Sequence, residues 1–298
     1  MKQFNSPVYP IPPSFKIDES IDLESTKKYI NYLKQNGAKI LMTTAGTSQF
    51  NLLDKDEIRS LNQIVSEFDG KKIIGLPSLS MYHLETEIRL LNDKNLEDCS
   101  LLIIFPERYY NDEQVVKFFE QVTKISNYPV LAHGNPIKVG NGGNLDYGKN
   151  LLKKLSKIPN FIGIKEESSS LDFASKNLSN LNLEIIVAGG SMSRFWFLQP
   201  FGATTYLTGV GSFNPKIEED FYMNYSNENF EEAKKIMENY EKPLFETFMN
   251  LGWHASMRYA LNQMGYIQNN RKPFVELTES EKILIEQKTK IFNQWNKH

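Results

Sequence analysis

Residues 161–167, Phe-Ile-Gly-Ile-Lys-Glu-Glu (FIGIKEE), form a short apolar run that ends in one lysine and two glutamates. The apolar residues are consecutive, which is typical of a strand buried on both faces in a parallel sheet. An ammonium group at the end of such a strand is either solvated at the rim of the fold or kept from water for a chemical purpose. The same seven residues therefore bear on both the fold and the chemistry of the chain.

Seven further runs of this kind occur along the chain, and amphipathic stretches of helical period separate them. Together with Phe161–Lys165, the predicted strands are Val8–Ile11, Lys39–Thr43, Lys72–Gly75, Leu101–Phe105, Val130–His133, Glu184–Ala188 and Thr204–Thr208. Eight strand–helix repeats within about 220 residues predict an α/β fold, a (β/α)8 TIM barrel. A doubly wound open sheet is the rival, but no signal for an antiparallel hairpin is present, which favours closure.

Helices are predicted where apolar residues recur at three- and four-residue spacing. Between the strands these are Leu23–Gln35, Asp56–Glu67, Glu85–Leu91, Glu113–Ile125, Leu145–Leu155 and Trp196–Pro200, and in the tail Glu218–Tyr225, Phe230–Tyr240, Leu244–Leu251, His254–Met264 and Glu279–Trp295. Asp22 and Asp54 are expected to cap the first two helices, and Gly37 to close the first. We expect a barrel over residues 1–220 and a C-terminal helical region over residues 221–298 packed on it.

The composition excludes several classes of protein. A formal net charge of −2 with a pI near 6.2 gives no reason to expect a nucleic-acid or membrane partner. Cys99 is the single cysteine, and the four histidines are far apart, so neither a disulfide framework nor a metal site is expected. No nucleotide fingerprint, signal peptide or long apolar span is present, so we expect a cytoplasmic protein without a cofactor.

In a barrel of this kind, the residues that follow each strand converge at one mouth. The candidates are Thr44, Gly46, Thr47 and Ser48 after the second strand, Tyr109 and Tyr110 after the fourth, His133 and Lys138 at the fifth, Lys165 at the sixth, Gly189 and Gly190 after the seventh and Gly209 after the eighth. The set contains few carboxylates, which argues against a divalent-metal site and against the paired carboxylates of a glycosidase.

Lys165 suits imine chemistry if water is kept from it. Burial disfavours the ammonium form and lowers the pKa of the amine, and a neutral amine forms an imine with a carbonyl substrate. Such an imine is an electron sink for cleavage, condensation or dehydration of a 2-oxo acid. Taken alone, a lysine at a strand end followed by two glutamates is more often a solvated rim residue, and His133 more often a core or loop histidine. The expected convergence of the candidate residues at one rim favours a catalytic role for Lys165 and His133.

Four segments carry a resemblance to a known family: PVYPIPPSF (7–15), FIGIKEESS (161–169), VAGGSMSRFWFLQPFGATTYLTGVGSFNP (187–215) and LGWHASMRYALNQMG (251–265). In this order they are similar to segments of the N-acetylneuraminate lyase / dihydrodipicolinate synthase superfamily of class I aldolases. The resemblance implies a barrel, and through the pattern G-[IV]-K-[ED]-x-[ST] it implies that Lys165 forms a Schiff base. It also implies a 2-oxo acid substrate, typically pyruvate, and a homo-oligomer, a dimer or commonly a homotetramer.

The sequence departs from the family pattern at several of its functional positions. His133 stands where the family carries a catalytic tyrosine in a Y-x-x-P pattern, and Lys138 stands where the synthases carry an arginine. An imidazole of ordinary pKa near 6.5 can act as a general base beside a neutral amine. The carboxylate-binding signature G-[ST]-T-G-E corresponds to residues 45–49, in which Gly46 has lost a hydroxyl and Thr47 keeps one.

Two further loops resemble family segments less closely. The loop PERYYND (106–112) is similar to the tyrosine-bearing loop of the synthases, so Tyr109 and Tyr110 are both candidates for a catalytic role. The acidic pair of sialic-acid lyases is replaced by Gly190-Ser191, and we expect Gly189 and Gly190 to leave room for the distal part of the substrate.

The interpretation that follows is a class I lyase, namely an aldolase, condensing synthase or dehydratase, that acts on a 2-oxo acid such as pyruvate through a Schiff base on Lys165. The alternative within the family is 4-hydroxy-tetrahydrodipicolinate synthase itself, which the changes at His133 and Lys138 weaken. An alternative from another class is a catalytically silent barrel that binds a small molecule or serves as a structural protein, since a fold does not dictate a function.

Overall fold

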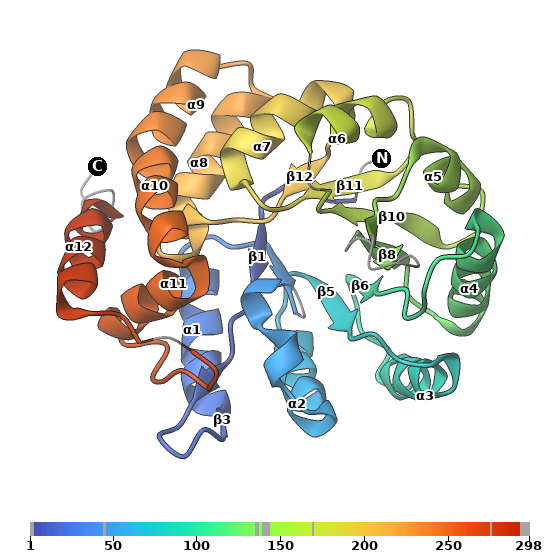
Figure 1. The fold of residues 1–298 in the computed structure, drawn as a ribbon, viewed down its shortest axis with the longest axis horizontal. Helices are drawn as coiled ribbons and strands as arrows, with labels where there is room; N and C mark the ends of the chain where they lie inside the picture. Colours follow the sequence, from blue (N-terminus) through green and yellow to red (C-terminus); the bar gives the residue numbers. More distant parts are fainter. Residues whose placement is uncertain are drawn as a thin grey trace. The chain divides into compact units, whose positions relative to one another are not determined.

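Eight parallel strands and the helices between them build the chain (Figure 1). The computed structural model describes residues 3–43, 46–134, 137–138, 144–168, 170–274 and 276–292. The parallel strands in these ranges are β1 (Val8–Pro10), β4 (Ile40–Met42), β5 (Lys71–Leu76), β6 (Cys99–Ile103), β7 (Val130–Gly134), β10 (Phe161–Glu166), β11 (Glu184–Val187) and β12 (Thr205–Tyr206). Each overlaps one predicted strand, so the predicted alternation is confirmed.

Helices follow the strands as expected from the spacing of apolar residues. They are α1 (Leu23–Gln35), α2 (Lys55–Ser66), α3 (Met81–Asn92), α4 (Asp112–Ile125), α5 (Lys149–Leu155), α6 (Leu171–Leu178) and α7 (Ser191–Leu198). The sequence prediction missed α6, because a helix of eight residues in which only Ala174 and Leu178 are buried has weak periodicity. It also began α7 five residues late. No helix in the described ranges is long and apolar enough to cross a bilayer.

The predicted caps account for where the first two helices begin. The side chain of Asp22 accepts a hydrogen bond from the amide of Ser25 at the start of α1. Asp54 forms a capping box with Glu57 at the start of α2, so the first amides of the helix are satisfied by side chains. Gly37, just beyond α1, adopts a φ of 99°, which glycine tolerates at a helix end.

Contacts divide the chain into two compact units, of which the first contains residues up to Val8 and Phe68–Leu207. In this unit β5, β6, β7, β10, β11 and β12 are neighbours in that order, and Val8 forms a parallel bridge with Leu207. Gly163 is needed where β10 meets β11, because a Cβ at this position would lie 2.0 Å from the carbonyl oxygen of Glu184. The unit thus contains a continuous parallel sheet, and the helices α3 to α7 connect or follow its strands along the chain.

The second unit contains Tyr9–Glu67 and the chain from Thr208 onward. Its tail is helical, with α8 (Pro215–Ser226), α9 (Phe230–Ile236), a π-helix (Met237–Glu241), α10 (Lys242–Leu251), α11 (Trp253–Gln263) and α12 (Glu279–Thr289). An antiparallel pair, β2 (Ser14–Phe15) and β3 (Ile21–Asp22), was not predicted from the sequence. The guanidinium groups of Arg258 and Arg271 lie 5.1 Å and 4.3 Å from the centre of the Phe15 ring, which ties this hairpin to the helical tail.

The division into a barrel over residues 1–220 and a helical region over 221–298 stays a prediction. Its boundary falls within α8, a helix that begins at Pro215 under the side-chain cap of Asn214. The predicted helix 230–240 is present as α9 continued by the π-helix, and the predicted helix from residue 279 is observed to Thr289 in α12.

Candidate active site

Lys165 and His133 lie side by side on neighbouring strands. Lys165 is the fifth residue of β10, and in the parallel register of β10 with β7 its Cα partner is His133. Residues paired in this way project to the same face of the sheet. Both side chains are buried, with exposed fractions of 0% and 1%, and the distance from Lys165 Nζ to His133 Nε2 is 3.0 Å. The structure therefore brings together two of the residues that the sequence marked for chemistry.

The close approach of the two strands depends on Gly134, the residue after His133. A Cβ at Gly134 would lie 2.3 Å from the carbonyl oxygen of Lys165, which is nearer than any real Cβ contact. A larger residue would push β7 away from β10 at the level of the two functional side chains. The glycine thus sets the distance between His133 and Lys165.

Glu167 completes a cluster of three titratable groups. Its Oε2 accepts a hydrogen bond of 2.6 Å from Lys165 Nζ and lies 3.1 Å from His133 Nε2. The side chain of Glu167 is 31% exposed, whereas its two neighbours are shielded from solvent. The ammonium of Lys165 can donate to both neighbours at once, because it carries three donors and the neutral imidazole accepts at Nε2.

Burial dominates the electrostatics of the two inner groups. It lowers the pKa of Lys165 below the ordinary value of 10.5, although the carboxylate of Glu167 offsets part of the effect. Burial and the adjacent positive charge of Lys165 lower the pKa of His133 to about 4, so its imidazole is neutral at pH 7. Its pKa is therefore far below the ordinary imidazole value near 6.5.

The pKa of the third group, Glu167, shifts in the direction opposite to that which burial alone would cause. Burial would raise the pKa of Glu167, but the charge of Lys165 and the hydrogen bond that its amine donates outweigh it and bring the pKa to about 2. At neutral pH Glu167 is a carboxylate, and it faces an amine that burial disposes to lose its proton.

Glu166 faces away from this cluster and anchors the end of β10. Its Oε2 accepts hydrogen bonds of 2.7 Å and 3.2 Å from Nη2 and Nε of Arg194 in α7. Its Oε1 accepts a 2.8 Å bond from the amide of Ser168, whose carbonyl in turn accepts a 3.0 Å bond from Arg194 Nη2. These bonds hold the residues on both sides of Glu167, so its position is set by its neighbours.

The sequence interpretation missed Glu166, Glu167 and Arg194. It took the two glutamates as a sign of solvation, yet side chains in a strand alternate between faces, and Glu167 lies two residues beyond Lys165. That spacing was the available signal for a carboxylate beside the lysine. Nothing in the sequence indicated Arg194, because its pairing with Glu166 joins two βα units.

Tyr109 and Tyr110 lie in the loop after β6. The hydroxyl of Tyr109 donates a 2.9 Å hydrogen bond to Asp112, and burial, together with this carboxylate, raises the pKa of its phenol. Tyr110 is 73% exposed, and its amide donates to Gln114. The hydroxyl of Tyr109 and the amide of Tyr110 thus bond to residues at the start of α4, and a catalytic role for either tyrosine stays a prediction.

The glycines after β11 differ in the room they leave. A Cβ at Gly189 would meet no atom within 4 Å, although its φ of 75° favours glycine. A Cβ at Gly190 would lie 2.9 Å from Arg194 Cβ, so space there is limited by the residue that holds Glu166. Gly189 therefore has more open space beside it than Gly190, and a role of either in leaving room for substrate stays a prediction. The side chain of Lys138 lies outside the described residues.

The remaining candidates belong to the second unit. Gly46, Thr47 and Ser48 form a short 3₁₀ helix (Gly46–Ser48) after β4, where Thr47 and Ser48 are buried and Ser48 Oγ has no hydrogen-bond partner among the residues that the structure describes. The amide of Gly209 donates a 3.1 Å hydrogen bond to the buried carboxylate of Glu218. Thr44 lies outside the described residues. These residues stay candidates for substrate binding.

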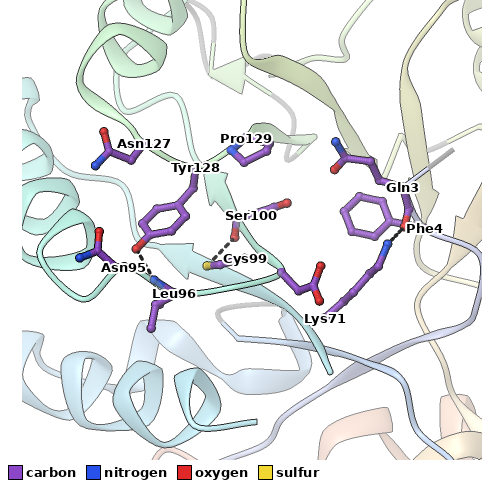
Figure 2. Close-up of a pocket in the computed structure, with 11 residues that line it drawn as sticks. Gln3, Phe4, Lys71, Asn95, Leu96, Cys99, Ser100, Asn127, Tyr128 and Pro129 are labelled. Carbon is purple, nitrogen blue, oxygen red and sulfur yellow. Dashed lines mark hydrogen bonds between the residues drawn. The ribbon is translucent and has the colours of Figure 1, made fainter. Parts of the chain in front are cut away.

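A separate hollow of about 570 Å³ lies at the other end of the same strands, where β5, β6 and β7 begin (Figure 2). Two of its polar groups take part in hydrogen bonds: the amine of Lys71 donates to the carbonyl of Gln3, and the hydroxyl of Tyr128 accepts from the amide of Leu96. Burial raises the pKa of the Cys99 thiol to about 12, so the thiol stays protonated. The single thiol of this hollow is therefore not in its nucleophilic form at neutral pH.

Comparison with known proteins places this chain in a family. Residues 4–291 match the model of the dihydrodipicolinate synthetase family. The 4-hydroxy-tetrahydrodipicolinate synthase of Ehrlichia canis is 24% identical over 291 residues, which cover 94% of each chain.

Solved structures agree. The dihydrodipicolinate synthase of Thermotoga maritima has a TM-score of 0.82 at 20% identity, covering 98% of this chain and 99% of its own. A chloride-inhibited dihydrodipicolinate synthase from Acinetobacter baumannii, in complex with pyruvate, has a TM-score of 0.81 at 16% identity, covering 97% and 99%. These likenesses confirm the predicted (β/α)8 barrel with C-terminal helices. The chain belongs to the dihydrodipicolinate synthetase family and is a lyase of that family.

Proposed function

We propose that this lyase acts on a 2-oxo acid such as pyruvate through a Schiff base on Lys165. The observation that carries the proposal is a shielded amine within hydrogen-bond distance of a neutral imidazole and a carboxylate. Burial favours the neutral amine, and the neutral amine is the form that adds to a carbonyl carbon. The pyruvate complex of the Acinetobacter baumannii relative supports a 2-oxo acid as substrate.

The imine would act as an electron sink for the bond beside it. Once the 2-oxo acid is bound as an iminium ion, the proton on its C3 becomes acidic, and its removal gives an enamine that forms or breaks a bond at C3. His133 is suited to accept that proton, because its imidazole is neutral at pH 7 and its Nε2 lies 3.0 Å from Lys165 Nζ. Glu167 would balance the charge of the iminium.

The substrate carboxylate would be held by hydroxyls and amides at residues 44–48, as the family signature suggests. Thr44, Thr47 and Ser48 carry the hydroxyls of this segment. Gly189 would leave space for the distal part of the substrate. Family membership further supports a cytoplasmic location and a homo-oligomeric assembly. Light scattering of the purified protein measures the number of subunits in the assembly.

Borohydride trapping tests the proposed imine. Incubation with pyruvate followed by borohydride should add the mass of a reduced pyruvyl group to the intact protein, and Lys165→Ala should abolish the addition. Lys72→Met is the matched control, because Lys72 is also a buried strand lysine, but its amine donates to the carbonyl of Glu97. No adduct with any of a panel of 2-oxo acids would favour a silent barrel, and an adduct that survives Lys165→Ala would assign the imine elsewhere.

A second assay separates the reactions within the family. Pyruvate with aspartate semialdehyde is the substrate pair of the synthases, and we expect slow turnover because His133 replaces the tyrosine. Turnover as fast as that of a genuine synthase would instead identify this activity as the reaction of the chain.

A further inference from the structure

We propose that Glu167 is a catalytic residue that takes the proton from the amine of Lys165 and returns it to the oxygen that leaves as water. The inference rests on the proposed imine at Lys165 and names the group that moves protons during its formation. A carboxylate two residues beyond the lysine is not part of the sequence pattern from which Lys165 was identified.

The geometry supports Glu167 as the proton acceptor. The 2.6 Å bond from Lys165 Nζ to Glu167 Oε2 is shorter than the 3.0 Å distance from Nζ to His133 Nε2. A proton that crosses the shorter bond converts an ion pair into two neutral groups; the burial of Lys165 favours this transfer, and the low pKa of Glu167 makes the protonated carboxyl a transient state that passes its proton on. The carboxylate is also the one member of the cluster with appreciable exposure, so it can exchange protons with solvent or with a bound substrate.

The charged groups around Glu167 leave its carboxylate available to the amine. Lys165 from β10 and His133 from β7 face it directly. Glu166 is turned toward Arg194 of α7, which forms hydrogen bonds with Glu166 and Ser168. Arg194 therefore neutralises the charge of Glu166, and the carboxylate of Glu167 pairs with Lys165.

The steps balance without any other reactant. Glu167 takes one proton from the ammonium, and the neutral amine adds to C2 of the 2-oxo acid while the carbonyl electron pair moves to oxygen. Glu167 gives its proton to this oxygen, takes the second proton from nitrogen and passes it to the hydroxyl. The C–O bond then breaks, water leaves, and the nitrogen lone pair forms the C=N bond. An ammonium and a ketone have become an iminium and water, and Glu167 is again a carboxylate.

The test measures how fast the borohydride-trapped adduct forms with excess pyruvate in rapid-quench experiments. Glu167→Gln keeps the size of the side chain but removes its basicity, so the rate should fall about 100-fold while the final adduct is the same. Glu167→Asp keeps the charge on a shorter side chain, and its rate of adduct formation should lie between those of the wild type and Glu167→Gln. Asp172→Asn, which removes an exposed carboxylate of α6, should match the wild type.

The pH profile separates a proton carrier from a merely structural residue. Removing the carboxylate deprives the ammonium of its partner and lowers the pKa of Lys165, so the rising limb of the rate should move to lower pH in Glu167→Gln. If Glu167→Gln forms the adduct within about threefold of the wild-type rate with an unmoved limb, the inference is overturned and the imine stands. Absence of the adduct in the wild type overturns the imine itself. Should Glu167→Gln not fold, the same comparison on Glu167→Asp decides.

Discussion

The carboxylate of Glu167 lies 2.6 Å from the amine of Lys165 because the two residues are separated by a single position at the end of a strand. Side chains in a strand alternate between faces, so residues 165 and 167 project to the same side and residue 166 to the other. The two adjacent glutamates consequently have different partners: Glu167 contacts the buried amine, whereas Glu166 pairs with Arg194.

The stability of the protein should depend on His133 at mildly acidic pH. The pKa of His133 is about 4 in the folded chain and near 6.5 in the unfolded chain, so the unfolded state binds more protons between these values. The contribution of His133 to the free energy of unfolding is then fully present above pH 6.5 and is lost as the pH falls toward 4. The loss is about 2.5 kcal/mol at pH 4.5.

Replacement of the imidazole by an amide tests this. Between pH 7.5 and pH 4.5, the free energy of unfolding of the wild type should fall by about 2.5 kcal/mol more than that of His133→Gln. Urea unfolding at both pH values measures the difference. The window of Glu167 lies lower, between its ordinary pKa and about 2, and so contributes little here. Parallel pH dependence of the two proteins would mean that His133 does not carry this effect.

The pair of Glu166 and Arg194 should be costly to break from one side. Arg194 and Glu166 are about 10% and 5% exposed, so Arg194→Met leaves a nearly buried carboxylate without its partner. We expect a loss of about 3–5 kcal/mol in the free energy of unfolding. The double variant Arg194→Met with Glu166→Met should recover part of the loss, because no charge is then left unpaired.

Lys176→Met is the control for this pair. It breaks the ion pair with Asp172 on α6, where both side chains are about 70% exposed, and should cost under about 1 kcal/mol. A loss of the same small size for Arg194→Met would show that the buried pair contributes no more than a surface pair.

Gly163→Ala should destabilise the sheet strongly. The added methyl group would lie 2.0 Å from the carbonyl oxygen of Glu184, so β10 and β11 must separate. We expect a loss of about 3 kcal/mol in chemical unfolding. Gly148→Ala, with its nearest contact at 3.8 Å, should cost under about 1 kcal/mol, and equal effects of the two substitutions would refute the steric explanation.

Gly134→Ala should affect the chemistry as well as the stability of the fold. The methyl group would meet the carbonyl oxygen of Lys165 at 2.3 Å and move His133 away from the amine. A displacement of about 1 Å can lower the rate of a positioned reaction by about 100-fold, and we expect a loss of this size in enamine formation, measured as deuterium exchange at the pyruvate methyl group. Exchange at the wild-type rate, with folding verified by circular dichroism, would contradict the role given to Gly134.

Much of the fold follows from local features of the sequence. Consecutive apolar runs, helical periodicity and the caps at Asp22 and Asp54 are properties of neighbouring residues, so the eight strands and most helices were predictable. The helix α6 and the β2–β3 hairpin were not, because each is too short to give a periodic signal; the hairpin also bonds to a distant segment, since Asn269 donates to the carbonyl of Phe15.

The candidate site divides in the same way. The sequence by itself determined that a lysine lies near the end of the sixth strand and a histidine near the end of the fifth, because both positions follow directly from the order of strands. Only the tertiary structure decided that these side chains share one register, that Gly134 sets their separation, and that burial lowers the pKa of His133 to about 4. It also decided that Glu167 contacts the amine while Arg194 holds Glu166. The physical reason is that strand order is a local property, whereas the pKa and partner of a side chain depend on which distant strands and helices exclude water from it.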